Sequence, residues 1–330
     1  MTKTIGIIGA GAWGTALAQV YAAAGNNITL WAREPEVIAA VNGSHENTVF
    51  LPGIKLHQSI RATADMAEAA QCDVVLLVTP AQHVRSTIGN LRGTLGAKPV
   101  VICAKGLETG TGKMLSDAAL EEAPGLPVAV LTGPTFAGEI ARGLPSAVTI
   151  AAAGLGTAEF IRDALASKTL RPYVSTDLTG VQIGGAVKNV IAIASGIVAG
   201  KGLGDSARAA LITRGLAEIA RLGAALGAKK ETLMGMCGVG DLVLTASSMQ
   251  SRNYSLGFEL GKGRTLADIL GARNAVTEGV HTAKATMVMA ANLKVEMPIT
   301  AAVDACLNEG VSIDDAIAAL MERPLRSESA

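Results

Sequence analysis

The stretch that decides the fold is TIGIIGAGAWGTALAQVYAAA at residues 4–24. A short apolar run leads into GAGAWG at residues 9–14, and a segment of helical character follows directly. A buried strand, a G-x-G-x-x-G turn and a helix N-terminus, in this order, are typical of a dinucleotide-binding βαβ unit. Gly9 permits the turn, Gly11 lets the backbone approach a pyrophosphate, and Gly14 lets helix and strand pack closely. We therefore expect phosphates at the positive end of this helix.

The same stretch also resembles a secretory signal, because Lys3 precedes an apolar segment that ends in small residues at 22–24. Four glycines interrupt that segment, and the apolar pattern continues into a second expected strand at residues 28–31. A G-x-G-x-x-G can also arise by chance in a chain with 38 glycines. The order of strand, turn and helix favours the nucleotide interpretation.

Composition narrows the class of protein. With 330 residues the chain is long enough for two domains, each with its own core. The formal net charge is zero, so no basic field indicates nucleic acid or an anionic membrane. No uninterrupted apolar run reaches the roughly 18 residues of a membrane span. The four cysteines are scattered without metal-ligand spacing, which indicates reduced thiols in a cytoplasmic protein and neither a metal site nor a disulfide framework.

Further apolar runs in the first half predict a Rossmann-type α/β domain. They are residues 28–31, 73–80, 99–104, 127–131 and 147–152. Because these runs are nearly continuous and alternate with helical segments, we expect a mainly parallel sheet covered on both faces. Residues 42–63 show no strong period and predict a long irregular connection.

The end of the second expected strand bears on the choice of cofactor. An NAD-preferring site usually places an acid there, where it binds the ribose hydroxyls. Here the sequence is Trp31-Ala32-Arg33-Glu34. Arg33 could receive a 2′-phosphate, so we expect NADP(H) to be preferred and NAD(H) to be accepted. The alternative is a solvated arginine at the start of a helix.

The sequence pattern of the second half of the chain predicts helices throughout. Helices are expected at residues 178–200, 205–227, 251–260, 277–292 and 299–308. Asp205 is an expected N-cap, and Ser312 begins a capping-box pattern. We therefore expect a nucleotide-binding domain over residues 1–180 and an all-helical substrate domain over 181–330. Because no flexible linker joins them, the two domains should pack together.

Several polar residues in these segments could carry chemistry. Lys105 follows an expected strand and could point into the crevice beyond the sheet, or lie exposed in a loop. Lys188 is the only charged residue between Asp177 and Lys201, and burial there would lower its pKa towards the range useful for acid–base work. The alternative is a lysine that reaches the surface from the helix. Asp241 in the GVGDL loop could pair with such a lysine.

A possible phosphate receptor lies further along the chain. Ser251-Arg252-Asn253 opens an expected helix, and a helix N-terminus with an arginine suits a phosphate group. Ordinary helix capping is the alternative.

At this point the chain resembles the bacterial type of NAD(P)-dependent glycerol-3-phosphate dehydrogenase. The motifs that carry the resemblance are GAGAWGTALA at 9–18, CAKGLE at 103–108, LTGPTFAGE at 131–139, AVKNVIAIASG at 186–196, GVGDLVLT at 238–245, SRN at 251–253 and VTEGV at 276–280. They follow the family's order over nearly the whole chain. The resemblance implies a Rossmann domain followed by a helical domain like the C-terminal domain of 6-phosphogluconate dehydrogenase. It also implies reversible reduction of dihydroxyacetone phosphate to sn-glycerol 3-phosphate, which feeds glycerophospholipid synthesis.

The resemblance also implies a role for each matching residue. Lys188 is implied as the acid–base group, Lys105 as the group that polarises the carbonyl, and Asp241 as the carboxylate that holds the catalytic lysine. The implied substrate contacts are Lys105, Gly133, Thr135, Lys188, Asn189, Asp241, Thr245, Ser251, Arg252 and Asn253. The full set of expected cofactor contacts joins the glycine turn and Arg33 to the residues that the resemblance implies. It consists of Gly9, Gly11, Ala12, Trp13, Gly14, Arg33, Lys105, Ala137, Arg252, Val276 and Glu278. Ala12 stands where many relatives have serine.

Two other classes of function fit parts of the sequence. A related dehydrogenase of a β-hydroxy acid or a ketopantoate-like substrate would share the glycine turn and a lysine in the helical domain, but the SRN and GVGDL segments count against it. A non-catalytic NADPH-binding sensor would bind cofactor without turnover and would have no use for Lys188 beside Asp241. A homodimer is compatible with the Ala- and Gly-rich helical half, but no sequence pattern specifies one.

Overall fold

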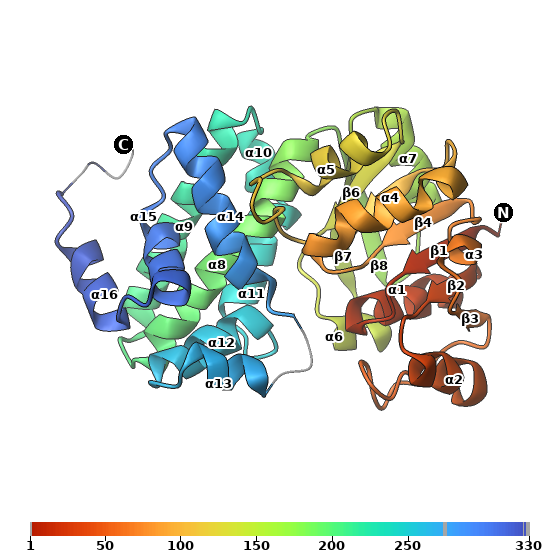
Figure 1. The fold of residues 1–330 in the computed structure, drawn as a ribbon, viewed down its shortest axis with the longest axis horizontal. Coiled ribbons are helices and arrows are strands. Elements are labelled where there is room, and N and C mark those ends of the chain that lie inside the picture. Colours follow the sequence, from red (N-terminus) through yellow and green to blue (C-terminus); the bar gives the residue numbers. More distant parts are fainter. Residues whose placement is uncertain (1, 273–275, 326, 328–330) are drawn as a thin grey trace.

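The structure is a computed structural model that describes residues 2–272, 276–325 and 327. Figure 1 shows two parts, a sheet flanked by helices at the N-terminal end and a group of packed helices in the C-terminal half. The helix labelled α8 (Leu178–Gly200) runs from the border of the sheet into the centre of the helical part (Figure 1). The expected fold class, a Rossmann-type domain followed by a helical domain, is confirmed.

The sheet has eight strands in the order β3-β2-β1-β4-β5-β6-β7-β8. Their bounds are β1 Thr4–Ile8, β2 Asn27–Trp31, β3 Ile60–Thr63, β4 Val74–Leu77, β5 Val100–Ile102, β6 Val128–Thr132, β7 Ser146–Ala152 and β8 Leu170–Ser175. Every neighbouring pair is parallel except β6 and β7, which are antiparallel. The expected mainly parallel sheet is therefore confirmed.

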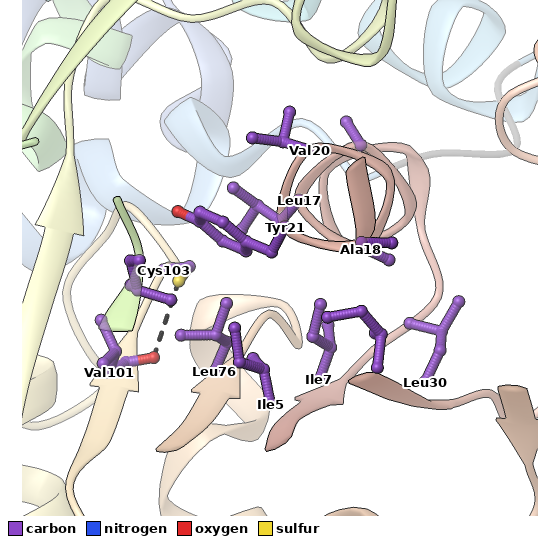
Figure 2. Packing of buried hydrophobic residues seen from close by; sticks show 14 of the residues in the cluster. Ile5, Ile7, Leu17, Ala18, Val20, Tyr21, Leu30, Leu76, Val101 and Cys103 are labelled. Atoms are coloured by element: carbon purple, nitrogen blue, oxygen red, sulfur yellow. Dashed lines mark hydrogen bonds between the residues drawn. The ribbon is translucent and has the colours of Figure 1, made fainter. Parts of the chain in front are cut away.

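Helices cover both faces of this sheet. They are α1 Ala12–Ala23, α2 Pro35–Ser44, α3 Met66–Ala69, α4 Val84–Leu95, α5 Leu115–Glu122, α6 Ala137–Ala141 and α7 Leu155–Ala164, with a short 3₁₀ turn, η1, at Ala81–His83. Figure 2 shows Leu17 and Tyr21 of α1 lying over Ile5, Leu76 and Val101 of three adjacent strands. The alternate strand residues belong to a second cluster on the other face. Strands buried on both faces need apolar residues at every position, which explains the continuous runs.

Two strands were not predicted. β3 lies within residues 42–63, which we expected to be irregular, and α2 also extends into that segment as far as Ser44. β8 was missed entirely. Both strands are at edges of the sheet, where one side lacks a partner and the run of apolar residues is broken. β8 even contains Pro172, which an edge strand tolerates because it need not donate on both sides.

The second half of the described chain is helical, and no strand occurs in it after β8. After α8 come α9 Asp205–Ala225, α10 Lys230–Leu233, the π-helical turn η2 Met236–Gly240, α11 Asp241–Ala246, α12 Arg252–Gly261, α13 Leu266–Gly271, α14 Glu278–Leu293, α15 Pro298–Asp304, the π-helical turn η3 Ala305–Glu309 and α16 Ile313–Met321. Ser312 caps α16 as expected, because its side chain accepts from Asp315 N. The expected cap at Asp205 is wrong: Gly204 is the N-cap and Asp205 is already helical.

Helix α8 is the core of the helical part. Within the described residues it is the one helix long and apolar enough to cross a membrane, but 89% of its most apolar window is buried inside the protein. Glycines let α12 approach it closely. A Cβ on Gly257 of α12 would lie 2.0 Å from the carbonyl oxygen of Ile193 on α8, and a Cβ on Gly196 of α8 would lie 2.1 Å from Tyr254 O. The two helices therefore meet backbone to backbone.

This contact predicts an asymmetry between two Gly→Ala substitutions. Gly257→Ala should lower the free energy of unfolding by about 2 kcal/mol or more, because the new methyl group must push two backbones apart. Gly93→Ala, at an exposed glycine inside α4 with open space around it, should raise it by about 0.5–1 kcal/mol because the unfolded chain loses freedom. Urea unfolding measures both, and equal effects would contradict the described packing.

Candidate active site

Lys188 lies in the middle of α8 and is only 4% exposed. Its Nζ donates to Asp241 Oδ1 at 3.0 Å and to Thr245 Oγ1 at 2.6 Å. Asp241 begins α11, and Thr245 lies one turn further along the same helix. The lysine therefore does not extend to the surface; its charge is held inside the protein by a carboxylate and a hydroxyl group.

A second lysine reaches the same carboxylate from the other domain. Lys105 follows β5, and its Nζ donates to Asp241 Oδ2 at 2.6 Å and to Gly133 O at 2.9 Å. Its side chain is 17% exposed, so it turns inward and does not extend into solvent. Gly133 follows β6, the strand beside β5, so both groups lie at the carboxyl edge of the sheet. One buried carboxylate thus joins two ammonium groups.

Burial and the charges of this cluster together set its pKa values. Burial lowers the pKa of Lys188 to about 8, and the ammonium group of Lys105 adds to this effect, while Asp241 opposes it. Burial alone would raise the pKa of Asp241, but the two lysines outweigh burial and hold that pKa below its usual range. Lys188 can therefore change its protonation state near neutral pH while Asp241 stays ionised.

Two glycines before Lys188 explain how α8 comes so close to the sheet. A Cβ on Gly185 would lie 2.8 Å from Thr132 Oγ1 of β6, and one on Gly184 would lie 2.9 Å from the carbonyl oxygen of Cys237 in the turn η2. The close approach places Lys188, one turn later, beside the carboxyl end of β6. Thr132 Oγ1 itself lies 3.5 Å from Asp241 Oδ2. We did not predict this contact, although Thr132 stands inside the LTGPTFAGE motif.

The neighbouring amides form a second polar chain. Asn253 Nδ2 donates to Asn189 Oδ1 at 2.8 Å, and Asn253 Oδ1 accepts from Gly279 N at 3.0 Å. Asn189 follows Lys188 on α8, and Gly279 lies in the first turn of α14. The chain of amides therefore links the lysine cluster to the segment that contains Val276 and Glu278.

The other residues expected around the substrate differ in burial and in hydrogen bonding. Ser251 is buried, and its hydroxyl accepts from Tyr254 N at 3.2 Å as the N-cap of α12. Arg252, the next residue, is exposed at the start of that helix. Thr135 Oγ1 donates to Gly133 O at 3.4 Å, within the turn that also holds Lys105. Ser251 therefore serves as a helix cap, while its neighbour Arg252 is exposed.

The glycine turn has the geometry that a pyrophosphate requires. Gly9 has a φ of +121°, which favours glycine, and a Cβ on Gly14 would lie 1.9 Å from Gly9 O. Nothing lies within 4 Å of the Cβ position of Gly11. Gly9 and Gly14 thus pack tightly against each other, while the Cβ position of Gly11, the N-cap of α1, faces open space. The glycine turn lies beside β1 and β4, where the strand order reverses direction.

Of five buried polar side-chain atoms without a hydrogen-bond partner in the described residues, three lie at or beside the carboxyl ends of β1 and β4. They are Trp13 Nε1, Thr79 Oγ1 and Glu278 Oε2. Trp13 is at the start of α1, Thr79 follows β4, and the other carboxylate oxygen of Glu278 accepts from Ala81 N at 3.1 Å. Burial raises the pKa of Glu278. Unsatisfied buried groups are costly, so their clustering here fits a polar ligand such as a dinucleotide.

The remaining expected cofactor residues differ in exposure and in the elements that carry them. Arg33 follows β2, its side chain is 82% exposed, and it pairs with Glu34 at 2.9 Å. Val276 is 42% exposed. Ala137 begins α6 and packs against the core cluster beneath α1. No group of three or more His, Cys, Asp or Glu side chains that could hold a metal ion occurs in the part of the chain that the structure describes.

A mainly parallel domain with a glycine turn, joined to a helical domain that supplies a buried lysine, defines a two-domain nucleotide-dependent dehydrogenase. Family models for the N-terminus and the C-terminus of NAD-dependent glycerol-3-phosphate dehydrogenase match residues 4–158 and 177–318. The chain belongs to this family, as expected from its motifs, and not to the ketopantoate-type alternative.

Comparisons with individual relatives support the same family. The chain is 56% identical to a glycerol-3-phosphate dehydrogenase [NAD(P)+] of Parvibaculum lavamentivorans, over 99% of this chain and 98% of the relative. It is 54% identical to the protein of the same name from Caulobacter vibrioides, over 99% of each chain. A solved structure of glycerol-3-phosphate dehydrogenase from Coxiella burnetii superposes with a TM-score of 0.93 at 35% identity, covering 98% of this chain and 99% of that one.

Proposed function

We propose that this protein catalyses the reversible NAD(P)H-dependent reduction of dihydroxyacetone phosphate to sn-glycerol 3-phosphate. The observation that carries the proposal is the buried Lys188, whose Nζ lies 3.0 Å from Asp241 Oδ1 and whose pKa is lowered to about 8. A group with such a pKa can donate a proton to a reacting oxygen and take it back in the reverse direction. Membership of the family supports the identity of the substrate.

The lysines have the donors that this chemistry needs. An ammonium group has three N–H donors, and two of those on Lys188 are engaged by Asp241 and Thr245. The third remains for the C2 oxygen of the substrate, to which Lys188 gives its proton. Lys105 likewise keeps one donor beyond its bonds to Asp241 and Gly133, and polarises the same carbonyl group. The bound nicotinamide supplies the hydride.

The other polar groups bind and orient the substrate. Asp241 is an acceptor for both lysines and fixes their positions. We assign the phosphate to the exposed Arg252 at the start of α12, because arginine and a helix N-terminus both favour an anion. The proposed substrate contacts are Lys105, Gly133, Thr135, Lys188, Asn189, Asp241, Thr245, Ser251, Arg252 and Asn253.

The cofactor lies along the carboxyl edge of the sheet in this proposal. The proposed contacts are Gly9, Gly11, Ala12, Trp13, Gly14, Arg33, Lys105, Ala137, Arg252, Val276 and Glu278. They are supported by the open position at Gly11 and the unpaired buried atoms of Trp13 and Glu278. We place the nucleotide domain at residues 1–180 and the substrate domain at 181–330, a division that falls in the first turn of α8, shortly after the last strand ends at Ser175.

We also propose a cytoplasmic homodimer that feeds glycerophospholipid synthesis. Glycerol 3-phosphate is a small charged product, and the reducing cofactor is a cytoplasmic one. Free cysteines at all four positions agree with a reducing compartment. The Ala- and Gly-rich helical half agrees with close packing of a second copy.

Initial rates test the reaction itself. Purified protein should oxidise NADPH, followed at 340 nm, when dihydroxyacetone phosphate is added, and NADH should support a slower reaction. Cofactor binding without turnover would overturn the substrate assignment. In that case a panel of keto acids would separate another dehydrogenase from a non-catalytic sensor.

Arg33 gives a prediction about cofactor preference. Its pair with Glu34 is exposed and contributes little, so the guanidinium is available to a 2′-phosphate. Arg33→Ala should raise KM for NADPH about tenfold through loss of a charged hydrogen bond, with little change in KM for NADH. Arg61→Ala, which removes an exposed arginine of the adjacent strand β3, is the matched control. Equal changes in KM for both cofactors would refute the role of Arg33.

A further inference from the structure

Asn47 is a buried amide that contacts the glycine turn from outside the motif. It lies in the connection after α2 and is fully buried, with 0% exposure. Its Nδ2 donates to Ala10 O at 2.8 Å and to Thr15 Oγ1 at 2.8 Å. Its Oδ1 accepts from Phe50 N at 3.0 Å, so the amide is anchored on both ends. No role in the reaction described above accounts for these bonds.

The bonds converge on one peptide group. Ala10 O also accepts from Thr15 Oγ1 at 3.2 Å, so two side chains hold this carbonyl in the interior of the protein. Ala10 C=O and Gly11 N–H belong to the same peptide unit, and no peptide bond among the described residues is cis. In a trans peptide the C=O and the N–H point in opposite directions. Holding Ala10 O towards Asn47 and Thr15 therefore turns Gly11 N–H to the opposite side, away from these two side chains.

We infer that Asn47, assisted by Thr15, is a positioning residue that presents the Gly11 N–H to the pyrophosphate of the cofactor. The inference rests on the proposed binding of NADPH at the glycine turn. A preset donor needs no reorganisation on binding, whereas a free peptide unit next to two glycines can rotate and lose that orientation. Asn47 itself does not touch the cofactor.

Asn42 provides a matched control. It is also an amide of this region, and it makes a comparable pair of bonds: Nδ2 donates to Ala62 O at 2.9 Å and Oδ1 accepts from Ala62 N at 2.8 Å. These bonds hold strand β3 and do not involve the glycine turn. Asn42→Leu should therefore reduce stability without changing the orientation of Gly11.

The experiment compares Asn47→Leu, Thr15→Val and Asn42→Leu as full-length proteins. NADPH titration should give a Kd about tenfold higher in Asn47→Leu and about threefold higher in Thr15→Val, with Asn42→Leu within about twofold of the wild type. Thr15→Val keeps the shape of its side chain and serves if Asn47→Leu does not fold. The Ki of adenosine 2′-phosphate, which has no pyrophosphate, should stay unchanged in all three, and KM for NADPH should change more than kcat.

Three results would overturn the inference. They are an unchanged NADPH Kd in the folded variants of Asn47 and Thr15, an equal loss in Asn42→Leu, and an equal weakening of adenosine 2′-phosphate. If the wild type binds NADPH but does not reduce dihydroxyacetone phosphate, the proposed reaction fails, and the same Kd values still decide the role of Asn47. A wild type that does not bind NADPH would overturn both.

Discussion

Lys188→Met should lower kcat for dihydroxyacetone phosphate reduction by about 10³-fold, within the range of 10²–10⁴ that a positioned acid–base group contributes. Methionine fills a similar volume but has no proton to give. Asp241 keeps its bond to Lys105 in this variant, so no buried carboxylate is left without a partner. Steady-state rates at saturating NADPH measure the effect.

The control for this variant is the lysine that caps the end of the same helix. Lys201 follows α8 and forms a surface pair with Asp314, so Lys201→Met should retain nearly the full rate. The NADPH Kd of Lys188→Met should match the wild type, because the glycine turn lies in the other domain. A Lys188→Met enzyme with normal turnover would remove the acid–base role from this residue.

Asp241→Asn should produce the second large effect, a loss of about 10²-fold in kcat/KM. Asparagine retains the shape of the side chain, but two ammonium groups then share a buried site without a counter-charge. The pKa of Lys188 should fall further, since the carboxylate of Asp241 is what raises it against burial. The alkaline limb of the pH profile for reduction should therefore move to lower pH, and pH-dependent kinetics would detect the shift.

Asp177 tests whether this loss is specific. It is also buried, at 7% exposure, and its carboxylate accepts from Gly180 N at 2.8 Å and from Lys229 N at 2.8 Å. Asp177→Asn should lower the thermal midpoint but leave the pH profile in place. If both Asp→Asn variants lost activity without a shift of the profile, Asp241 would have only a structural role.

The sequence predicted those parts of the fold that are buried on all sides. β1, β4, β5 and β6 carry continuous apolar runs because helices cover both faces of the sheet, and α8 was predicted at its observed bounds. β3 and β8 were not predicted because edge strands do not need continuous apolar runs. The cap of α9 was misassigned because Asp205 and Gly204 are both acceptable at an N-cap, and only the backbone conformation decides between them.

A residue of the candidate site could be predicted where a charged side chain stands within an apolar stretch of sequence. Lys188 stood out in this way, and the structure brings it to Asp241, 53 residues away in sequence. Thr132 and Asn47 could not be found by such reasoning. A threonine at the end of a strand and an asparagine in an irregular connection are common, and their contacts depend on how distant segments meet. Long-range geometry of this kind leaves no local signal.

The most direct test of the central claim is the pH dependence of kcat/KM in both directions. Lys188 has a pKa of about 8 and must be protonated to reduce the ketone but neutral to accept a proton from the alcohol. An acid–base role for Lys188 predicts that reduction of dihydroxyacetone phosphate falls as pH rises through about 8, while oxidation of glycerol 3-phosphate rises over the same interval. Profiles that change in the same direction, or a limb that persists in Lys188→Met, would contradict it.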